Sequence, residues 1–471
     1  TKLTAVFYAL LRDFHYLCPF IFKRMDKMQV DTHNKEFQDA LNLIQYTRQS
    51  VFLTGKAGTG KSTFLKYVCE VTKKKHIVLA PTGIAAINAG GSTLHSFFKL
   101  PFYPLLPDDP KFSLKDGKLH SFLKYTSAHR KLIKEVELVI IDEISMVRAD
   151  IIDFIDKILR VYSQNMREPF GGKQILLVGD VFQLEPVIKN DEREIINRFY
   201  PTPYFFSARV FQEMELVSIE LTKVYRQSDK IFVNVLDHIR TNTAGAADLQ
   251  LLNTRYNTHI EENESDMYIT LATRRDTVDF INEKKLSELP GESTILTGEI
   301  HGEFPESSLP TQMELEVKPG AQIIFIKNDY DHRWVNGTIG TISGIDEEDT
   351  LYVITEDGQE FDVKKDSWRN IRYKYNELEK KIEEEELGVF PIRLAWAITI
   401  HKSQGLTFSR VVIDFTGGVF AGGQAYVALS RCTSLDGIQL KKQITRGDIF
   451  VRPEIVKFSQ RFNNRQSIEK A

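Results

Sequence analysis

Short apolar runs alternate with longer stretches in which apolar residues recur at helical spacing, and this pattern covers most of the chain. The helical spacing is clear in Phe37, Ala40, Leu41 and Ile44, directly before an apolar run that starts at Val51. Further apolar runs end in turn residues or carboxylates, and they comprise 77–80, 137–141 and 174–178. A repeat of strand, loop and helix predicts an α/β fold with a parallel sheet whose loops carry the functional groups.

Between Lys318 and Pro391 the pattern changes to closely spaced short β runs. These runs are divided by Asn-Gly, Glu-Glu-Asp and Asp-Gly turns, and they comprise 323–326, 338–342, 351–355 and 360–363. Short strands at this spacing predict a small antiparallel barrel. The acidic stretch Glu377–Glu386 is expected to be a solvated helix or tether. The α/β pattern then resumes with the largely apolar segment Ile392–Ile400.

The apolar run at Val51 leads into a glycine-rich turn and then into a predicted helix at Phe64–Val71. The pattern G-x-x-x-x-G-K-S between a strand and a helix is typical of a phosphate-binding P-loop. Glycines let the backbone approach an anion, and the helix N-terminus directs N–H groups and a positive dipole towards it. In such a site Lys61 holds the β- and γ-phosphates and Ser62 binds Mg²⁺. The predicted NTP site comprises Gly58, Thr59, Gly60, Lys61, Ser62 and Thr63.

Two carboxylates follow the apolar run that ends at Ile141. Asp142, at the strand tip, suits contact with Mg²⁺ either directly or through a bound water, and Glu143 suits the base that positions and activates the attacking water. Paired acids at the end of a buried strand have few structural uses, because unpaired buried charge is costly. Gln183, in the loop after the next strand, could sense the γ-phosphate or hold the water, and it could equally be an amide that stabilises a turn.

Two segments after the P-loop have the composition of a single-strand contact. Thr82 and Gly83 follow a strand end, where they could present a hydroxyl and a backbone N–H to a phosphodiester. The segment 92–99 interleaves small polar, aromatic and basic residues, so that His95 could contact a phosphate and Phe98 could stack on a base. As an isolated patch, the same segment would more often be core and helix cap.

Three further residues are candidates for the NTP site. Gln38 lies on the predicted helix before the P-loop, where its amide could read an adenine edge or simply face solvent. Arg226 stands at a predicted strand-to-helix junction. Arg431, near the end of a predicted helix, could reach across a cleft as an arginine finger, and alone it could equally be a surface or salt-bridged residue.

Composition narrows the class of protein. With 471 residues, of which 42% are apolar and 27% charged, the chain is expected to be a globular protein of two or more domains. The net charge of −3 restricts any nucleic-acid surface to a local channel. Cys18, Cys69 and Cys432 lack zinc-type spacing and fit a reducing compartment, and no apolar run reaches membrane-spanning length. The aromatic-rich segment 1–22 is expected to be an extension, with a docked amphipathic helix as the alternative.

Eight motifs then occur in an order that identifies a family. They are Gly-Lys-Ala-Gly-Thr-Gly-Lys-Ser-Thr, Ala-Pro-Thr-Gly-Ile-Ala-Ala, Thr-Leu-His-Ser-Phe-Phe, Ile-Asp-Glu-Ile-Ser-Met-Val, Gly-Asp-Val-Phe-Gln-Leu-Glu-Pro-Val, Val-Tyr-Arg-Gln, Thr-Ile-His-Lys-Ser-Gln-Gly and Val-Ala-Leu-Ser-Arg. Together, between Gln38 and Leu440, they resemble the superfamily-one helicases that move 5′ to 3′ on DNA, and most closely the Pif-one family.

The resemblance implies two RecA-like domains, with ATP and Mg²⁺ in the cleft between them, and an SH3-like β insertion on the second domain. The implied boundaries are an extension at 1–25, RecA-like domain 1 at 26–220 with an insertion at about 100–134, RecA-like domain 2 at 221–317 and 391–450, the β insertion at 318–390 and a tail at 451–471. The implied ATP-site residues are Gln38, Lys61, Ser62, Asp142, Glu143, Gln183, Gly405, Arg226 and Arg431. The motifs that line the single-strand channel in the family contain Thr82, Gly83, His95, Phe98, Thr399, His401 and Ser403.

The resulting hypothesis is an ATP-dependent 5′-to-3′ DNA helicase that acts as a monomer on single-stranded DNA and on forked or tailed duplexes. G-quadruplexes and RNA–DNA hybrids are further candidate substrates, and DNA repair, recombination, replication and telomere maintenance are candidate pathways. We expect a cytoplasmic, nucleoid-associated protein in a bacterium, or a nuclear or mitochondrial one in a eukaryote. One alternative is a DNA-stimulated ATPase subunit of a repair nuclease complex. Another, a nucleotide switch that ignores DNA, predicts an Asn-Lys-x-Asp motif that the sequence lacks.

Overall fold

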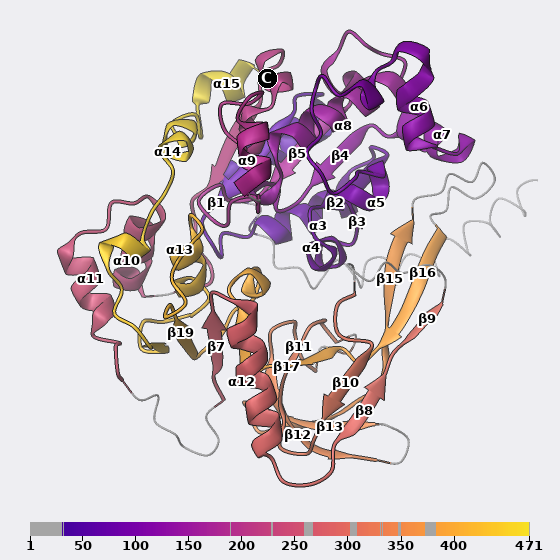
Figure 1. Ribbon diagram of the computed structural model, residues 1–471. Coiled ribbons are helices and arrows are strands. Elements are labelled where there is room, and N and C mark those ends of the chain that lie inside the picture. The colour runs from indigo at the N-terminus through magenta and orange to yellow at the C-terminus, as the bar shows by residue number, and fades with distance from the viewer. Residues whose placement is uncertain are drawn as a thin grey trace, which may run out of the picture.

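The computed structural model describes residues 31–470 except residues 32, 189, 228, 259–266, 302–308, 330, 332, 347–349 and 373–382. One parallel β-sheet lies in the upper part of Figure 1, a second lies below it and to the left, and the antiparallel strands lie below the first sheet and to the right of the second. Two parallel sheets in one α/β chain agree with the expected RecA-like fold. The expected extension at 1–25 lies outside the described residues.

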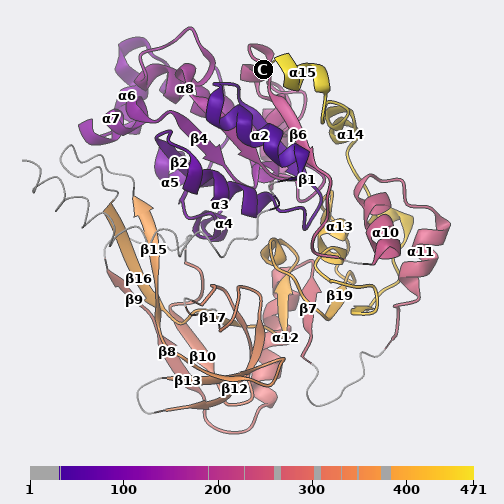
Figure 2. The ribbon, with the colours of Figure 1, turned by 180° about the vertical axis from the view of Figure 1, so that it is seen from behind.

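The first parallel sheet has the strand order β3-β2-β4-β5-β1-β6. Successive residues of its buried strands face opposite sides, so that Phe52 and Ile141 belong to one apolar core and Leu53 and Ile140 to another. Helices therefore cover both faces, with α2 and α3 on the face seen in Figure 2. The strands are β1 (Val51–Gly55), β2 (His76–Ala80), β3 (Ser92–Thr93), β4 (Leu138–Ile141), β5 (Gln174–Val178) and β6 (Val217–Leu221). The helices are α2 (Lys35–Tyr46), α3 (Lys61–Val71), α4 (Gly83–Ala89), α5 (Leu94–Phe98), α6 (Lys118–Leu123), α7 (Ser127–Glu135), α8 (Ala149–Tyr162) and α9 (Asn190–Ile196).

The second parallel sheet has the strand order β18-β7-β19-β20. Its core joins apolar residues of these strands to Phe232 and Ile239 of helix α10 and to Val427 of helix α13. No helix in the described part of the chain is long and apolar enough to cross a membrane. The strands are β7 (Ile269–Ala272), β18 (Ala397–Thr399), β19 (Val411–Asp414) and β20 (Ile438–Leu440), and the helices are α10 (Lys230–Arg240), α11 (Ala246–Asn253), α12 (Arg275–Glu288) and α13 (Gln424–Leu429).

The antiparallel strands form three sheets, in the orders β14-β13-β12-β11-β17, β15-β16-β9 and β10-β8. The five-stranded and two-stranded sheets share a core in which the Trp334 ring stacks on Phe325 with ring centroids 4.4 Å apart, whereas Trp368 of β15 and Val389 of β16 belong to a separate, smaller cluster. The strands are β8 (Thr294–Thr297), β9 (Glu299–His301), β10 (Glu314–Val317), β11 (Gln322–Phe325), β12 (Ile339–Ile345), β13 (Leu351–Thr355), β14 (Glu360–Val363), β15 (Asp366–Arg372), β16 (Glu383–Val389) and β17 (Ile392–Leu394).

The structure corrects two expectations for this region and divides one predicted segment. The segment Ile392–Ile400 forms two strands, because β17 pairs antiparallel with β11 whereas β18 pairs parallel with β7. The acidic stretch is not simply a helix or tether, since its residues 383–386 pair with β15 as part of β16. The antiparallel strands also extend beyond the expected bounds of 318–390, from Thr294 to Leu394.

After the second parallel sheet, the C-terminal segment returns to the first one as α14 (Pro453–Ser459) and α15 (Arg465–Lys470). The Phe458 ring stacks on Phe206 with centroids 4.3 Å apart. The Asn463 side chain accepts from Glu220 N at 2.8 Å and donates to Glu220 O at 3.1 Å. These bonds cover the open edge of β6, and Figure 1 shows both helices beside the first sheet.

Candidate functional site

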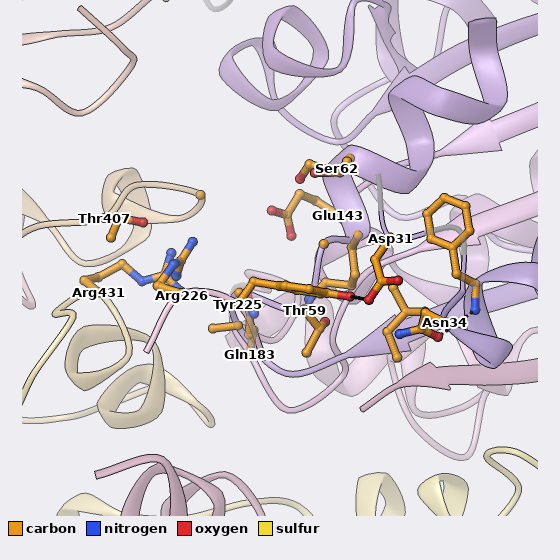
Figure 3. A pocket seen from close by; sticks show the side chains of 18 residues that line it. Asp31, Asn34, Thr59, Ser62, Glu143, Gln183, Tyr225, Arg226, Thr407 and Arg431 are labelled. Atoms are coloured by element: carbon orange, nitrogen blue, oxygen red, sulfur yellow. Dashed lines mark hydrogen bonds between the residues drawn. The ribbon is translucent and has the colours of Figure 1, made fainter. Parts of the chain in front are cut away.

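A cavity of about 660 Å³ lies between the two parallel sheets. One wall is the turn between β1 and α3, and the opposite wall is made by residues that follow β6, β18 and α13 (Figure 3). Most of the predicted ATP-site residues lie together in the lining of this cavity. They are Gly58, Thr59, Gly60, Lys61, Ser62, Thr63, Glu143, Gln183, Arg226, Gly405 and Arg431.

The turn between β1 and α3 depends on glycine at two positions. Gly60 has φ +88° and Gly58 has φ +78°, a left-handed conformation that other residues rarely adopt. A Cβ on Gly58 would also lie 2.4 Å from Arg226 Cβ, so the absent side chain is what lets Arg226 approach the turn. The Lys61 ammonium donates to the carbonyls of Gly55 at 2.7 Å and Lys56 at 2.9 Å. Burial lowers the pKa of Lys61, and nearby Asp180 and Glu143 oppose that change.

The two carboxylates at the end of β4 are buried together. Asp142 accepts a hydrogen bond from the backbone N–H of Glu143 at 2.9 Å. Burial, and then the neighbouring Glu143, raise the pKa of Asp142 to about 7. Burial also raises the pKa of Glu143, while Lys61 and Arg431 oppose the change. Glu143 has φ 49°, a left-handed conformation that is strained in a residue with a side chain.

Asp142 and Ser62 line a second cavity, a groove of about 570 Å³ that shares Ser62, Glu143 and Gly405 with the nucleotide-sized one. A carboxylate and a hydroxyl facing one space are the oxygen ligands that Mg²⁺ takes beside phosphate oxygens. The residues present therefore fit a magnesium ion held by Ser62 and Asp142, whose charge would neutralise the phosphates.

Arg226, in the segment that follows β6, and Arg431, directly after α13, line the cavity beside the P-loop. Arg226 donates to Ser430 O at 3.3 Å, and Arg431 donates to Val427 O at 3.0 Å and to Ser430 Oγ at 3.0 Å. Burial and then Arg226 lower the pKa of Arg431 to about 9, and burial lowers the pKa of Arg226. Neither forms an ion pair with a carboxylate in the part of the chain that the structure describes. Two buried cations beside a P-loop make a cavity that favours a polyanion.

Several cavity residues were missed from the sequence. Tyr225 donates to Asp31 Oδ2 at 2.9 Å, and Lys223 Nζ lies 2.7 Å from the same oxygen, so these side chains close one end of the cavity. Asn34 and Phe37 line the same end. The sequence signal that could have identified Tyr225 as a cavity residue was its position directly before Arg226. Gln38, expected to read adenine, is exposed on α2 and is not among the residues that line the cavity.

The predicted DNA contacts are divided between the groove and the core. Thr82 and His401 line the groove. Gly83 is buried as the first residue of α4, and Thr82 caps that helix by accepting from Ala85 N at 3.3 Å. Thr399 ends β18, where its hydroxyl accepts from Lys402 N at 3.3 Å.

Three other predicted contacts do not line the groove. His95 stacks on the exposed ring of Phe102 with centroids 4.7 Å apart, and burial lowers the pKa of His95. The prediction is wrong for the ring of Phe98, which is 0% exposed in the first core and has no free face for a base. It is also wrong for the hydroxyl of Ser403, which is fully buried and donates to Ile400 O at 2.7 Å.

A buried ion-pair network joins the two parallel-sheet units beneath the cavity. Arg240 of α10 lies 3.1 Å from Asp180, in the loop that carries Gln183, and 2.9 Å from Glu220 of β6. The P-loop residue Ala57 donates its backbone N–H to Tyr426 of α13 at 2.9 Å. These contacts hold α10 and α13 against the loops of the first sheet.

Comparisons with known proteins agree with this geometry. A model of the PIF1-like helicase family matches residues 30–244. The ATP-dependent DNA helicase Pif1 of Bdellovibrio bacteriovorus is 32% identical over 439 residues, which cover 91% of each chain. The crystal structure of Bacteroides sp Pif1 in complex with ADP-AlF4 is 41% identical, with a TM-score of 0.82 over 90% of this chain and 96% of that one.

The same Bacteroides protein bound to single-stranded DNA is 40% identical, with a lower TM-score of 0.66 over 92% of this chain and 97% of that one. The arrangement of the present structure is thus nearer to the nucleotide complex without DNA than to the DNA complex. Identity above 30% over nine-tenths of both chains, with the nucleotide cavity described above, establishes the relationship. The chain belongs to the PIF1-like helicase family and is an ATP-dependent DNA helicase.

Proposed function

We propose that the chain moves 5′ to 3′ along single-stranded DNA and opens forked or tailed duplexes with the energy of ATP hydrolysis. The observation that carries the proposal is the shared wall between the two cavities. Ser62, Glu143 and Gly405 face both the nucleotide cavity and the groove that contains Thr82 and His401. A change at the phosphates therefore acts on the same residues that border the DNA groove.

In the proposed cycle, Lys61 and the P-loop N–H groups bind the phosphates, and Ser62 with Asp142 would hold Mg²⁺. Glu143 accepts a proton from the attacking water, and Gln183 orients that water. Arg226 and Arg431 stabilise the charge on the γ-phosphate only when the two sheets are close, so nucleotide binding favours closure and hydrolysis removes that preference.

The groove between the parallel sheets and the antiparallel strands is the proposed path of the single strand. Bacteroides Pif1 has been crystallised bound to single-stranded DNA, and a further solved structure concerns DNA unwinding at forked duplex DNA by two coordinating Pif1 helicases. For this chain we propose a monomer on single-stranded DNA, with the five-stranded antiparallel sheet as the SH3-like unit of the family. Opening each base-pair step costs about 1.4 kcal/mol, and we propose that ATP hydrolysis supplies this free energy as the duplex opens step by step.

The test is strand displacement by the purified chain on duplexes with a 5′ tail, a 3′ tail or a fork. We expect displacement from the 5′-tailed and forked substrates, and none after Lys61→Ala. Displacement from the 3′-tailed substrate alone would refute the polarity. ATP hydrolysis stimulated by single-stranded DNA without any displacement would instead support a motor subunit that needs a nuclease partner. Adding a G-quadruplex ahead of the duplex tests that further candidate substrate.

A further inference from the structure

The groove continues into a small recess at the antiparallel strands. The recess has a volume of about 30 Å³ and shares Ile87, Trp368, Lys402 and Gln404 with the larger groove. One wall is α4 of the first parallel sheet, and the other is made by β11, β15 and β17. A cavity needs about 10–15 Å³ to hold one water, so this space admits about two water-sized atoms and no base.

The polar side chains that line the recess include two cations, Arg393 and Lys402, and two buried N–H groups without acceptors, on Trp368 and Gln404. The guanidinium of Arg393, on β17, forms no hydrogen bond or ion pair with any residue that the structure describes. The indole N–H of Trp368 is buried, in a side chain that is 3% exposed, and has no partner within the described ranges. The amide N–H of Gln404 is likewise buried and without a described partner. Lys402, the second cation, lies close enough to Arg393 for the two charges to repel.

Buried N–H donors without acceptors destabilise the folded protein unless a ligand supplies the missing acceptors. A buried donor without an acceptor costs about 1–3 kcal/mol, and buried donors of native proteins are nearly always paired. Burial alone lowers the pKa of Arg393 to about 10, which reflects the lack of a neutralising carboxylate. No residue that lines the recess is acidic, and its two asparagines, Asn88 and Asn336, bond to each other at 3.2 Å.

The missing group must be small, anionic and rich in acceptor oxygens. A phosphodiester has this chemistry, because its two free oxygens accept several hydrogen bonds and carry one negative charge. We propose that Arg393, Lys402 and the Trp368 indole N–H bind one phosphodiester of single-stranded DNA at the mouth of this recess, whose volume admits the two free oxygens of the phosphate. The inference rests on the proposed function, since it assigns one phosphate of the strand to a place beside Thr82 and His401 in the same groove.

The site would join three sheets through one phosphate. Trp368 belongs to β15, Arg393 to β17, and Lys402 follows β18 of the second parallel sheet. Lys327, which lies 5.3 Å from the Trp368 ring, already pairs with Asp366 at 2.7 Å and is not available as a further phosphate ligand. Charge at the site therefore depends on Arg393 and Lys402.

The experiment measures the affinity for a fluorescein-labelled oligothymidine by anisotropy between about 50 and 200 mM NaCl. Each phosphate contact to a single strand contributes about 0.7 to the slope of log K against log salt, so Arg393→Gln should reduce the slope by about 0.7. Arg393→Lys should restore it. Trp368→Phe removes only a neutral donor, so it should weaken binding about tenfold at every salt concentration with an unchanged slope.

The matched control is Arg461→Gln, an exposed arginine of the C-terminal segment, which should leave both slope and affinity as in the wild type. A slope and affinity for Arg393→Gln that equal those of this control would overturn the recess site. Failure of the wild-type chain to bind the oligonucleotide would overturn the proposed function itself, so the two failures are distinguishable.

A second measurement covers the case in which Arg393→Gln does not fold. The oligonucleotide should change the tryptophan emission of the wild type, and Trp368→Phe should remove that change while retaining the melting temperature. Emission that is unaffected by bound oligonucleotide in the wild type would refute the contact with Trp368.

Discussion

Arg240 is the residue whose removal should most weaken the contact between the two parallel-sheet units. Its guanidinium lies 3.1 Å from Asp180 and 2.9 Å from Glu220, and 4.4 Å from the centroid of the Phe182 ring. Arg240 is 3% exposed and Asp180 0% exposed, so water cannot replace either partner. Arg240→Met preserves most of the volume of the side chain and removes only the charge and its hydrogen bonds.

The expected loss is about 3–5 kcal/mol, the usual cost of leaving one member of a buried ion pair without its partner. For a unit of 150–250 residues, each kcal/mol lowers the melting temperature by about 2–4 °C, so we expect a decrease of about 10 °C. Adding Asp180→Asn removes the uncompensated charge and should recover part of this loss. The two substitutions should therefore be non-additive.

Differential scanning fluorimetry of the wild type, the two single variants and the double variant measures this coupling. Arg465→Met is the control, because the Arg465–Asp39 pair at 2.9 Å also joins distant segments but has side chains 48% and 22% exposed. Such a surface pair contributes about 0–1 kcal/mol. The reasoning fails if Arg240→Met is no less stable than Arg465→Met, or if the double variant shows the sum of the single losses.

Three further predictions concern the nucleotide cavity and the first core. Lys61→Ala should abolish phosphate release, because it removes the P-loop ammonium that lines the cavity; hydrolysis at the wild-type rate would exclude Lys61 from the site. Arg431→Ala should bind a fluorescent ATP analogue normally but lower turnover by about 10³-fold, and near-normal DNA-stimulated ATPase would contradict its role. Burial lowers the pKa of His129 from 6.5 to about 4, so the folded protein resists protonation that the unfolded chain accepts. The neutral His129 side chain should therefore contribute its full stability above pH 6.5, and the melting temperature should fall as the pH decreases from 6.5 towards 4. His129→Gln should make this fall in melting temperature smaller, and a variant with the wild-type pH profile would contradict the assignment.

Local sequence was sufficient where one segment makes a complete structural unit. The P-loop between β1 and α3 follows from Gly58, Gly60 and the apolar run before them, and Gln174–Val178 forms the predicted strand. Phe98 was misjudged because an aromatic residue beside polar ones has the same pattern on a surface and in a core. The division of Ile392–Ile400 was also invisible, since β17 and β18 are set by different partner strands.

Contacts between distant segments are the part that no local pattern could supply. Tyr225 and Asp31 meet across almost two hundred positions of sequence, and Arg393 and Trp368 meet only because two antiparallel sheets pack on α4. The order of the motifs identified the family, and through the family it predicted which residues belong to the ATP site. The individual bonds within that site depend on tertiary packing and came from the structure.

The course of the chain through its two parallel-sheet units constrains how they move. In the described residues it crosses between them twice, once after β6 and once between β20 and α14. Two covalent crossings define a line, and rotation about that line is the motion that stretches neither of them. Asn463 anchors the second crossing to β6, the strand from which the first one departs. Cutting the chain before α14 would leave a single pivot, so that the two units could twist as well as open, and nucleotide-driven closure would no longer bring Arg226 and Arg431 back to one position.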